Sequence, residues 1–153
     1  MEKKNNVLNT QEIIKSSRVG FWTVLTNGKD INELYADPTM LYLMGVPEDN
    51  DYSPSELYDF WVGNLALRGG QCVGVCGNAH FLDDAKTYME KMYKGNYAEI
   101  VYKYIHPTLG SIIIRCSGKR VEDMNGLARL QGTHKDISEA GINFSSLDEA
   151  DLY

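Results

Sequence analysis

Hydrophobic and polar residues follow two different periods along this chain, and the period changes several times. Residues 18–26 and 31–37 are rich in β-branched and aromatic side chains, and Asn27-Gly28 separates them. This pattern predicts a β-hairpin. Three later segments have the same character: 97–105, 110–121 and 126–137. Short polar turns join these segments, so we expect three further antiparallel strands.

Between the two groups of strands, the pattern changes to helical. Asp37-Pro38 predicts a helix start, because proline fits the first helical position, and Gly45 predicts the end of that helix. A second helix follows, with Ser53 or Ser55 as its N-cap. Its sequence continues to about Leu65, where the helical pattern stops.

Three more segments complete the predicted element list. In residues 81–95, apolar side chains recur at spacings of three and four, which predicts an amphipathic helix. Near the start, Asn9 and Glu12 form a capping box for a short helix. Residues 66–80 contain four glycines, so we expect an irregular loop there.

The element order is two strands, several helices and three strands. Hairpins at both ends indicate an antiparallel sheet with helices packed on one face, an α+β fold. The chain of 153 residues suits one such domain. We divide it into an N-terminal flanking helix at 1–18, a domain at 19–138 and a C-terminal tail at 139–153 that leads toward an output domain.

Composition narrows the function classes. The formal net charge of −6 argues against nucleic acid as a partner, because phosphate binding needs clustered Lys and Arg. No signal peptide and no membrane span are visible. We therefore expect a cytoplasmic protein and no membrane contact by this segment. Three cysteines form no disulfide framework.

No motif for catalysis is present. The sequence lacks the phosphate-binding pattern GxxxxGK[ST], the GxSxG elbow and HExxH, so we expect a protein that is not an enzyme. Cys72, Cys76 and His80 are spaced by four residues and would share one face of a helix. The glycines between them oppose a helix and a fourth ligand is missing, so we assign no metal site.

Three sequence segments together resemble a PAS domain. They are GFW at 20–22, the turn and strand at 106–126, and LQGTHKDIS at 130–138. The similarity spans about residues 10 to 138 and is greatest to bacterial PAS modules attached to diguanylate cyclases, histidine kinases or phosphodiesterases. It implies a five-stranded antiparallel sheet with helices on one face, and a sensory role in signal transduction. It also implies a homodimer and a ligand cavity between sheet and helices.

The last strand carries a glycine at its centre. The resemblance implies that Leu130, Gly132 and His134 face the cavity. A glycine at such a position leaves room for a ligand or for close approach of backbone, and it can equally accommodate a core aromatic side chain.

The strand SIIIRCS has two possible inward faces. Hydrophobicity places Ile112, Ile114 and Cys116 inward, whereas the resemblance places the alternate set inward. That set is Ile113, Arg115 and Ser117.

If Arg115 and His134 share the cavity, an anion must lie between the two cations, because an unpaired buried charge is costly. The anion is then a small ligand, unless Glu99 or another protein acid pairs with Arg115. The candidate ligand-binding residues are Arg115, His134, Gly132, Leu130, Ile113, Ser117, Tyr42 and Trp61.

We expect no bound cofactor. GNAHFLDD at 77–84 resembles the flavin-binding, light-sensing PAS subclass, but Ala79 replaces the photoreactive cysteine. Arg115 and His134 also stand where flavin-contacting amides are expected. Haem needs an axial ligand, and His80 is a candidate by position alone.

Two other function classes compete with the sensory module. One is a pure dimerisation domain whose cavity is filled by its own side chains, such as Tyr42, Trp61 and Tyr88. The other is a small isomerase-like enzyme, for which His134 and Asp136 on one strand face are the available acid–base pair.

Overall fold

The computed structural model describes residues 18–72 and 81–138. Several sequence predictions lie outside the described residues. These are the N-terminal helix with Asn9 and Glu12, the segment 73–80 with Cys76, Ala79 and His80, and the tail at 139–153.

One antiparallel sheet forms the framework of the domain, with the strand order β2-β1-β6-β5-β4-β3. The strands are β1 (Val19–Thr26), β2 (Asn32–Ala36), β3 (Gly69–Cys72), β4 (Ala98–His106), β5 (Gly110–Met124) and β6 (Leu127–Asp136). The first and last strands of the domain are therefore hydrogen-bonded neighbours at the centre of the sheet. The five predicted strands are all present, which confirms the α+β fold class.

The sixth strand corrects the loop prediction for residues 66–80. Residues 66–68 are the last turn of a helix, and β3 then pairs with the edge of β4, with Gly69 opposite Tyr104. Edge pairing needs only the backbone groups of β4, so the low strand propensity of a glycine-rich segment is overridden by tertiary hydrogen bonds.

Within the described residues, three helices lie between β2 and β4: α3 (Pro38–Met44), α4 (Pro54–Arg68) and α5 (Phe81–Tyr93). The predicted caps of α3 are confirmed, because the Asp37 carboxylate accepts a hydrogen bond from Met40 N and Gly45 adopts φ 83°. At the start of α4, Ser53 Oγ accepts from Glu56 N while Glu56 Oε1 accepts from Ser53 N. This capping box makes Ser53 the N-cap, and not Ser55.

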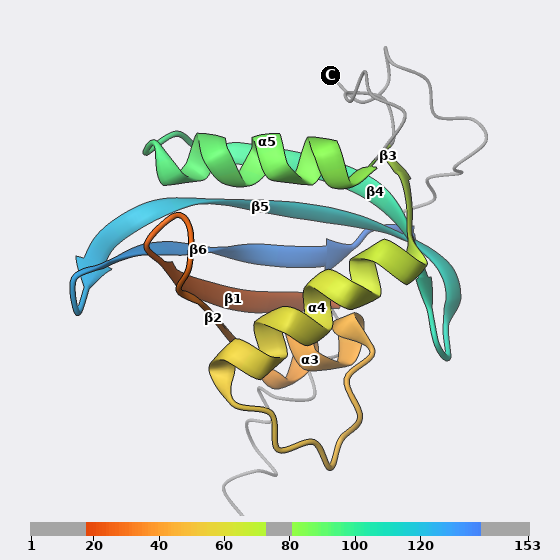
Figure 1. Ribbon diagram of the computed structural model, residues 1–153. Coiled ribbons are helices and arrows are strands. Elements are labelled where there is room, and N and C mark those ends of the chain that lie inside the picture. The colour runs from red at the N-terminus through yellow and green to blue at the C-terminus, as the bar shows by residue number, and fades with distance from the viewer. Residues whose placement is uncertain (1–17, 73–80, 139–153) are drawn as a thin grey trace, which may run out of the picture.

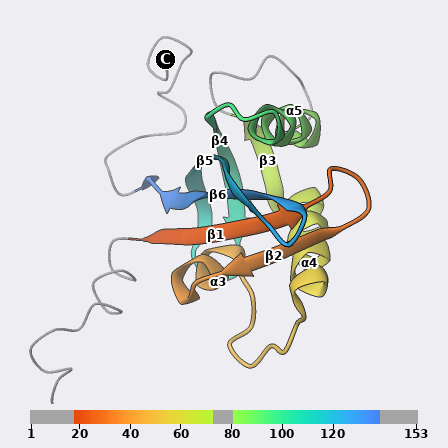
Figure 2. The same cartoon turned by 90° about the vertical axis from the view of Figure 1, so that its left-hand side faces the viewer.

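The helices cover one face of the curved sheet (Figure 1). Helix α5 contacts β4 and β5, whereas α3 contacts β1 and α4 contacts mainly β2 (Figure 2). The core between them is built from inward-facing strand residues and from Met44 and Met92, whose side chains are fully buried. None of the helices in the described ranges is long and apolar enough to cross a membrane.

Two glycines face each other where β5 and β6 approach closely. Gly118 pairs with Gly132, and a Cβ on Gly132 would lie 1.8 Å from the Ser117 carbonyl oxygen. A Cβ on Gly118 would lie 2.9 Å from the Trp22 ring, whose Nε1 donates to the Thr133 carbonyl. Gly132 therefore permits close backbone approach, and Gly118 makes room for the core tryptophan.

Candidate ligand-binding cavity

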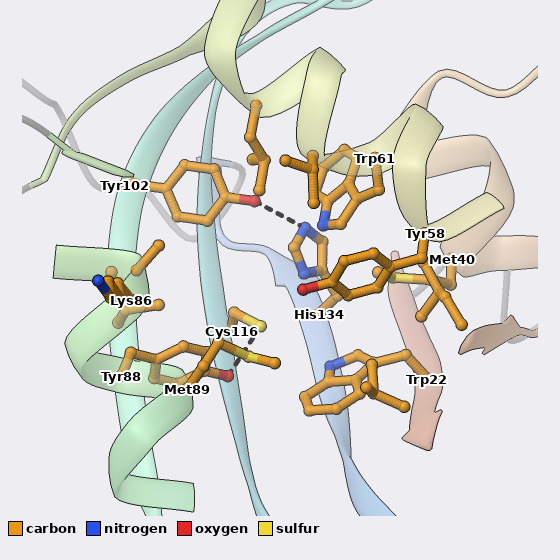
Figure 3. Close-up of a pocket in the computed structure, with 16 residues that line it drawn as sticks. Trp22, Met40, Tyr58, Trp61, Lys86, Tyr88, Met89, Tyr102, Cys116 and His134 are labelled. Atoms are coloured by element: carbon orange, nitrogen blue, oxygen red, sulfur yellow. Dashed lines mark hydrogen bonds between the residues drawn. The ribbon is translucent and has the colours of Figure 1, made fainter. Parts of the chain in front are cut away.

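A cavity of about 400 Å³ lies between the sheet and helices α4 and α5. Figure 3 shows Tyr58 and Trp61 from α4 on one side, Tyr88 and Met89 from α5 on the other, and His134 between them. The cavity is lined by Trp22, Val24, Leu34, Met40, Tyr58, Trp61, Val62, Leu65, Ala85, Lys86, Tyr88, Met89, Ile100, Tyr102, Cys116 and His134.

His134 is the most deeply buried polar side chain of this lining, with 1% of its surface exposed. Its Nε2 atom lies 3.0 Å from the Tyr102 hydroxyl, and its ring meets Trp61 edge-on at 5.4 Å between centroids. The other ring nitrogen, Nδ1, has no hydrogen-bond partner within the described part of the chain. Such an open buried group is uncommon, because most buried polar atoms are hydrogen-bonded.

Burial also fixes the charge of His134. Desolvation lowers its pKa from 6.5 to about 3, so the imidazole is neutral at physiological pH. A neutral imidazole carries one N–H donor and one nitrogen acceptor. His134 can therefore donate or accept one further hydrogen bond toward the cavity, but it does not supply a positive charge.

Tyr88 and Cys116 form a second buried polar pair. The Tyr88 hydroxyl lies 3.0 Å from Cys116 Sγ. Burial raises the pKa of the Cys116 thiol to about 12 and raises the pKa of Tyr88 well above 10. The thiol stays protonated and is no nucleophile at neutral pH. Neither residue was among the predicted ligand-binding positions, although hydrophobic alternation with Ile112 and Ile114 placed Cys116 inward.

Asn64 on α4 forms a hydrogen-bond network next to the cavity. Its Nδ2 donates to the Met44 carbonyl at 2.9 Å and to the Tyr104 hydroxyl at 2.8 Å, and Tyr104 donates to the same carbonyl at 2.8 Å. Burial raises the pKa of Tyr104 to about 12. This network joins α3, α4 and β4, and it positions Trp61, whose ring lies 5.4 Å from Tyr104.

The predicted placement of Arg115 in the cavity is wrong. Arg115 lies on the opposite face of the sheet, where its Nε is 3.4 Å from Glu99 Oε2 and both side chains are 44% exposed. The register pairs Arg115 with Lys135, whereas Cys116 pairs with His134. Hydrophobicity therefore gave the correct inward face of β5, and Ile113 and Ser117 lie on the outer face with Arg115. The expected anion between Arg115 and His134 is excluded by this geometry.

The remaining candidates divide into two groups. Trp61 and His134 line the cavity, as predicted. Tyr42 does not: it is 41% exposed and packs on His106 at 5.1 Å. Leu130 is buried in the hydrophobic core, and Gly132 packs against β5 backbone, so neither contributes to the cavity lining.

Asp136 is not positioned as a catalytic partner of His134. Its buried carboxylate pairs with the Arg18 guanidinium and accepts a hydrogen bond from Ser138 N at 2.9 Å. Within residues 18–72 and 81–138, no group of three or more His, Cys, Asp or Glu side chains is arranged to hold a metal ion.

Comparisons with known proteins agree on the fold. No protein-family model and no curated protein matches the chain. Among solved structures, the N-terminal domain of a diguanylate cyclase with a PAS/PAC sensor from Marinobacter aquaeolei is 21% identical, with a TM-score of 0.51 over 81% of this chain and 99% of that chain.

Two further structures are similar at lower identity. A domain assigned to a light- and redox-sensing histidine kinase from Haloarcula marismortui is 15% identical, with a TM-score of 0.50 over 84% of this chain and 97% of that one. An RNA-binding light-oxygen-voltage receptor is 11% identical, with a TM-score of 0.51 over 86% of this chain and 32% of that one. The chain therefore has the PAS fold, as the sequence motifs predict.

Proposed function

We propose that this domain is a non-enzymatic sensory module that binds a small molecule in the cavity between the sheet and helices α4 and α5. The observation that carries the proposal is the cavity itself, of about 400 Å³, lined by His134, whose buried Nδ1 atom has no hydrogen-bond partner among the described residues. Mostly apolar pockets of this size with a few convergent polar groups are typical small-molecule sites. The PAS fold also occurs in the similar domain of a diguanylate cyclase with a PAS/PAC sensor, which supports a sensory role.

Strand β6 offers a route from the cavity to the end of the domain. His134 lines the cavity, and Asp136 lies two residues further along the same strand. Asp136 binds Arg18 at the start of β1, and Ser138 Oγ accepts from Ile113 N at 2.8 Å. A ligand that moves His134 would shift this connection between two arrangements and so bias the orientation of an attached output domain.

A molecule that co-purifies with the protein would provide the most direct test. We expect native mass spectrometry to detect a bound small molecule, and denaturation to release it. Ala85→Trp should abolish binding, because residue 85 lines the cavity and a bulky side chain there would fill it. Glu90→Trp is the matched control, since it adds the same side chain at an exposed position of α5.

The competing function is a dimerisation domain without a ligand. A chain that carries no bound species, and whose response to a library of small organic molecules is the same in wild type and in folded Ala85→Trp, would contradict the proposal. The same spectra report the oligomer, so they also test the predicted homodimer.

A further inference from the structure

We infer that the cavity takes an uncharged, largely aromatic molecule with one hydrogen-bond acceptor of the carbonyl type, which accepts from the Nδ1–H of His134. The inference rests on the proposed ligand-binding function and specifies the chemistry of its ligand.

The cavity lining argues for an uncharged ligand. Among the described lining residues, Lys86 is the one with a charged side chain, and it is exposed at the surface of α5. None of the described lining residues carries a carboxylate. An ion placed beside His134 would lose its hydration without gaining a buried counter-ion, which costs several kcal/mol.

Aromatic side chains form most of the wall around His134. Trp22, Tyr58 and Trp61 surround its ring, and Tyr102 adds a further aromatic face (Figure 3). Flat aromatic molecules match such walls, because offset and edge-on ring contacts add to the free energy of apolar burial.

The hydrogen bond with Tyr102 determines which tautomer of His134 is favoured. A phenol hydroxyl is a proton donor with a pKa of about 10, and the imidazole nitrogen is the stronger base of the pair. The hydroxyl therefore donates to Nε2 across 3.0 Å. Nε2 is then the acceptor nitrogen, and the proton of the neutral ring is on Nδ1.

A donor without an acceptor is thus buried in the cavity wall. The Nδ1 atom has no partner among the described residues. The Tyr58 hydroxyl points toward the same ring in Figure 3, and Tyr58 also lines the cavity. Two donors that face one region fit a carbonyl oxygen, which has two lone pairs.

Two further uncharged polar groups of the described lining are already paired. Tyr88 bonds Cys116, and the Trp22 Nε1 donates to Thr133 O. A ligand therefore needs a polar group at the His134 end, and apolar surface elsewhere.

Three probes of similar size test this chemistry: acetophenone has a neutral acceptor, benzoate has a charge and ethylbenzene has neither. Their dissociation constants are measured by titrating ¹⁵N-labelled wild type and His134→Phe. We expect His134→Phe to raise the dissociation constant of acetophenone at least about tenfold and to change that of ethylbenzene by less than about twofold. The substitution removes a buried hydrogen bond from the acetophenone complex, whereas ethylbenzene has no acceptor for such a bond. Arg115→Ala, on the outer sheet face, is the control and should change neither constant.

A measurement on the wild type keeps the test valid if His134→Phe does not fold. The ¹⁵N spectrum of the imidazole should show a proton on Nδ1, and acetophenone should move that N–H proton downfield while ethylbenzene does not. A proton on Nε2 would overturn the assignment of an acceptor.

Other results separate the inference from the function on which it rests. Tighter binding of benzoate than of acetophenone, lost in Lys86→Ala, would overturn the inference and leave a sensory module for an anion. Equal loss of acetophenone and ethylbenzene in His134→Phe would overturn the hydrogen bond but not ligand binding. Absence of any bound species in native mass spectrometry, together with no response to all three probes, would contradict both proposals.

Discussion

A single histidine combines the two properties that define this site, because it is buried and its hydrogen bonds are incomplete. His134 is 1% exposed, and its Nε2 bonds Tyr102 while Nδ1 stays open. The unpaired nitrogen lowers the free energy of unfolding, since a buried polar group without a hydrogen bond costs about 1–3 kcal/mol.

The buried imidazole should make stability depend on pH. Its folded pKa is about 3, below the unfolded value of 6.5, so the unfolded chain binds a proton that the native domain does not. The contribution to stability is fully present above about pH 6.5 and is lost as the pH falls toward about 3. Between pH 6 and pH 5 the wild type should lose about 1 kcal/mol more unfolding free energy than His134→Phe.

Urea unfolding at several pH values measures this difference. Lys135→Gln, an exposed neighbour on the same strand, controls for the loss of a nearby cation. Parallel pH profiles of wild type and His134→Phe would show that His134 is protonated in the native state, contrary to the expectation.

At single residues, the sequence predicted the site in part. Trp61 and His134 were correctly assigned to the cavity, and Arg115 was not. The three consecutive isoleucines 112–114 are all buried, so hydrophobicity along β5 is not a clean alternation. The position of Arg115 shows which face of β5 is the inner one, because its side chain is half exposed. Successive strand residues point to opposite faces, so assigning one residue to the wrong face assigns the whole strand wrongly.

At the scale of elements, local signals predicted the helices and strands well. Asp37-Pro38, Gly45 and the capping box at Ser53 mark helix ends through contacts within a few residues. Strand β3 could not be predicted in this way, because its hydrogen bonds go to β4, at least 30 residues away along the chain. The cavity has the same origin, since its described lining comes from eight elements.

The β5–β6 pair should tolerate no side chain at residue 132. A Cβ there would lie 1.8 Å from Ser117 O and 2.7 Å from Gly118 Cα, both backbone atoms that cannot turn away. We expect Gly132→Ala to lower the unfolding free energy by about 3 kcal/mol or more, at the upper end of overpacking costs. Thermal and urea unfolding measure the loss.

A second glycine provides the matched control for that change. A Cβ on Gly63, inside α4, would meet nothing within 4 Å. Gly63→Ala should therefore raise the unfolding free energy by about 0.5–1 kcal/mol, because alanine favours helix more than glycine does. Similar effects of the two substitutions would contradict the close approach of β5 and β6.

At the scale of the whole molecule, the two ends of the domain are joined. Strands β1 and β6 are neighbours, and Asp136 N donates to Arg18 O at 3.1 Å. Their side chains form an ion pair in which the Asp136 carboxylate is 0% exposed and Arg18 is 26% exposed. Arg18 and Asp136, near the two ends of the described domain, therefore lie side by side, and Asp136 belongs to the strand that carries His134.

Removal of Arg18 and removal of the Asp136 charge should lower the unfolding free energy by different amounts. Arg18→Ala leaves a fully buried carboxylate without its cation, which should lower the unfolding free energy by about 3 kcal/mol. Asp136→Asn keeps an acceptor for Ser138 N and leaves an arginine that reaches water, so it should cost about 1 kcal/mol. Urea unfolding gives both values.

Hydrogen exchange should locate the effect, since the amides of Asp136 and Ile137 donate to Arg18 O and Ile113 O. We expect faster exchange at both amides in Arg18→Ala than in Asp136→Asn, and equal costs with unchanged exchange would show that the ion pair does not hold the two ends together.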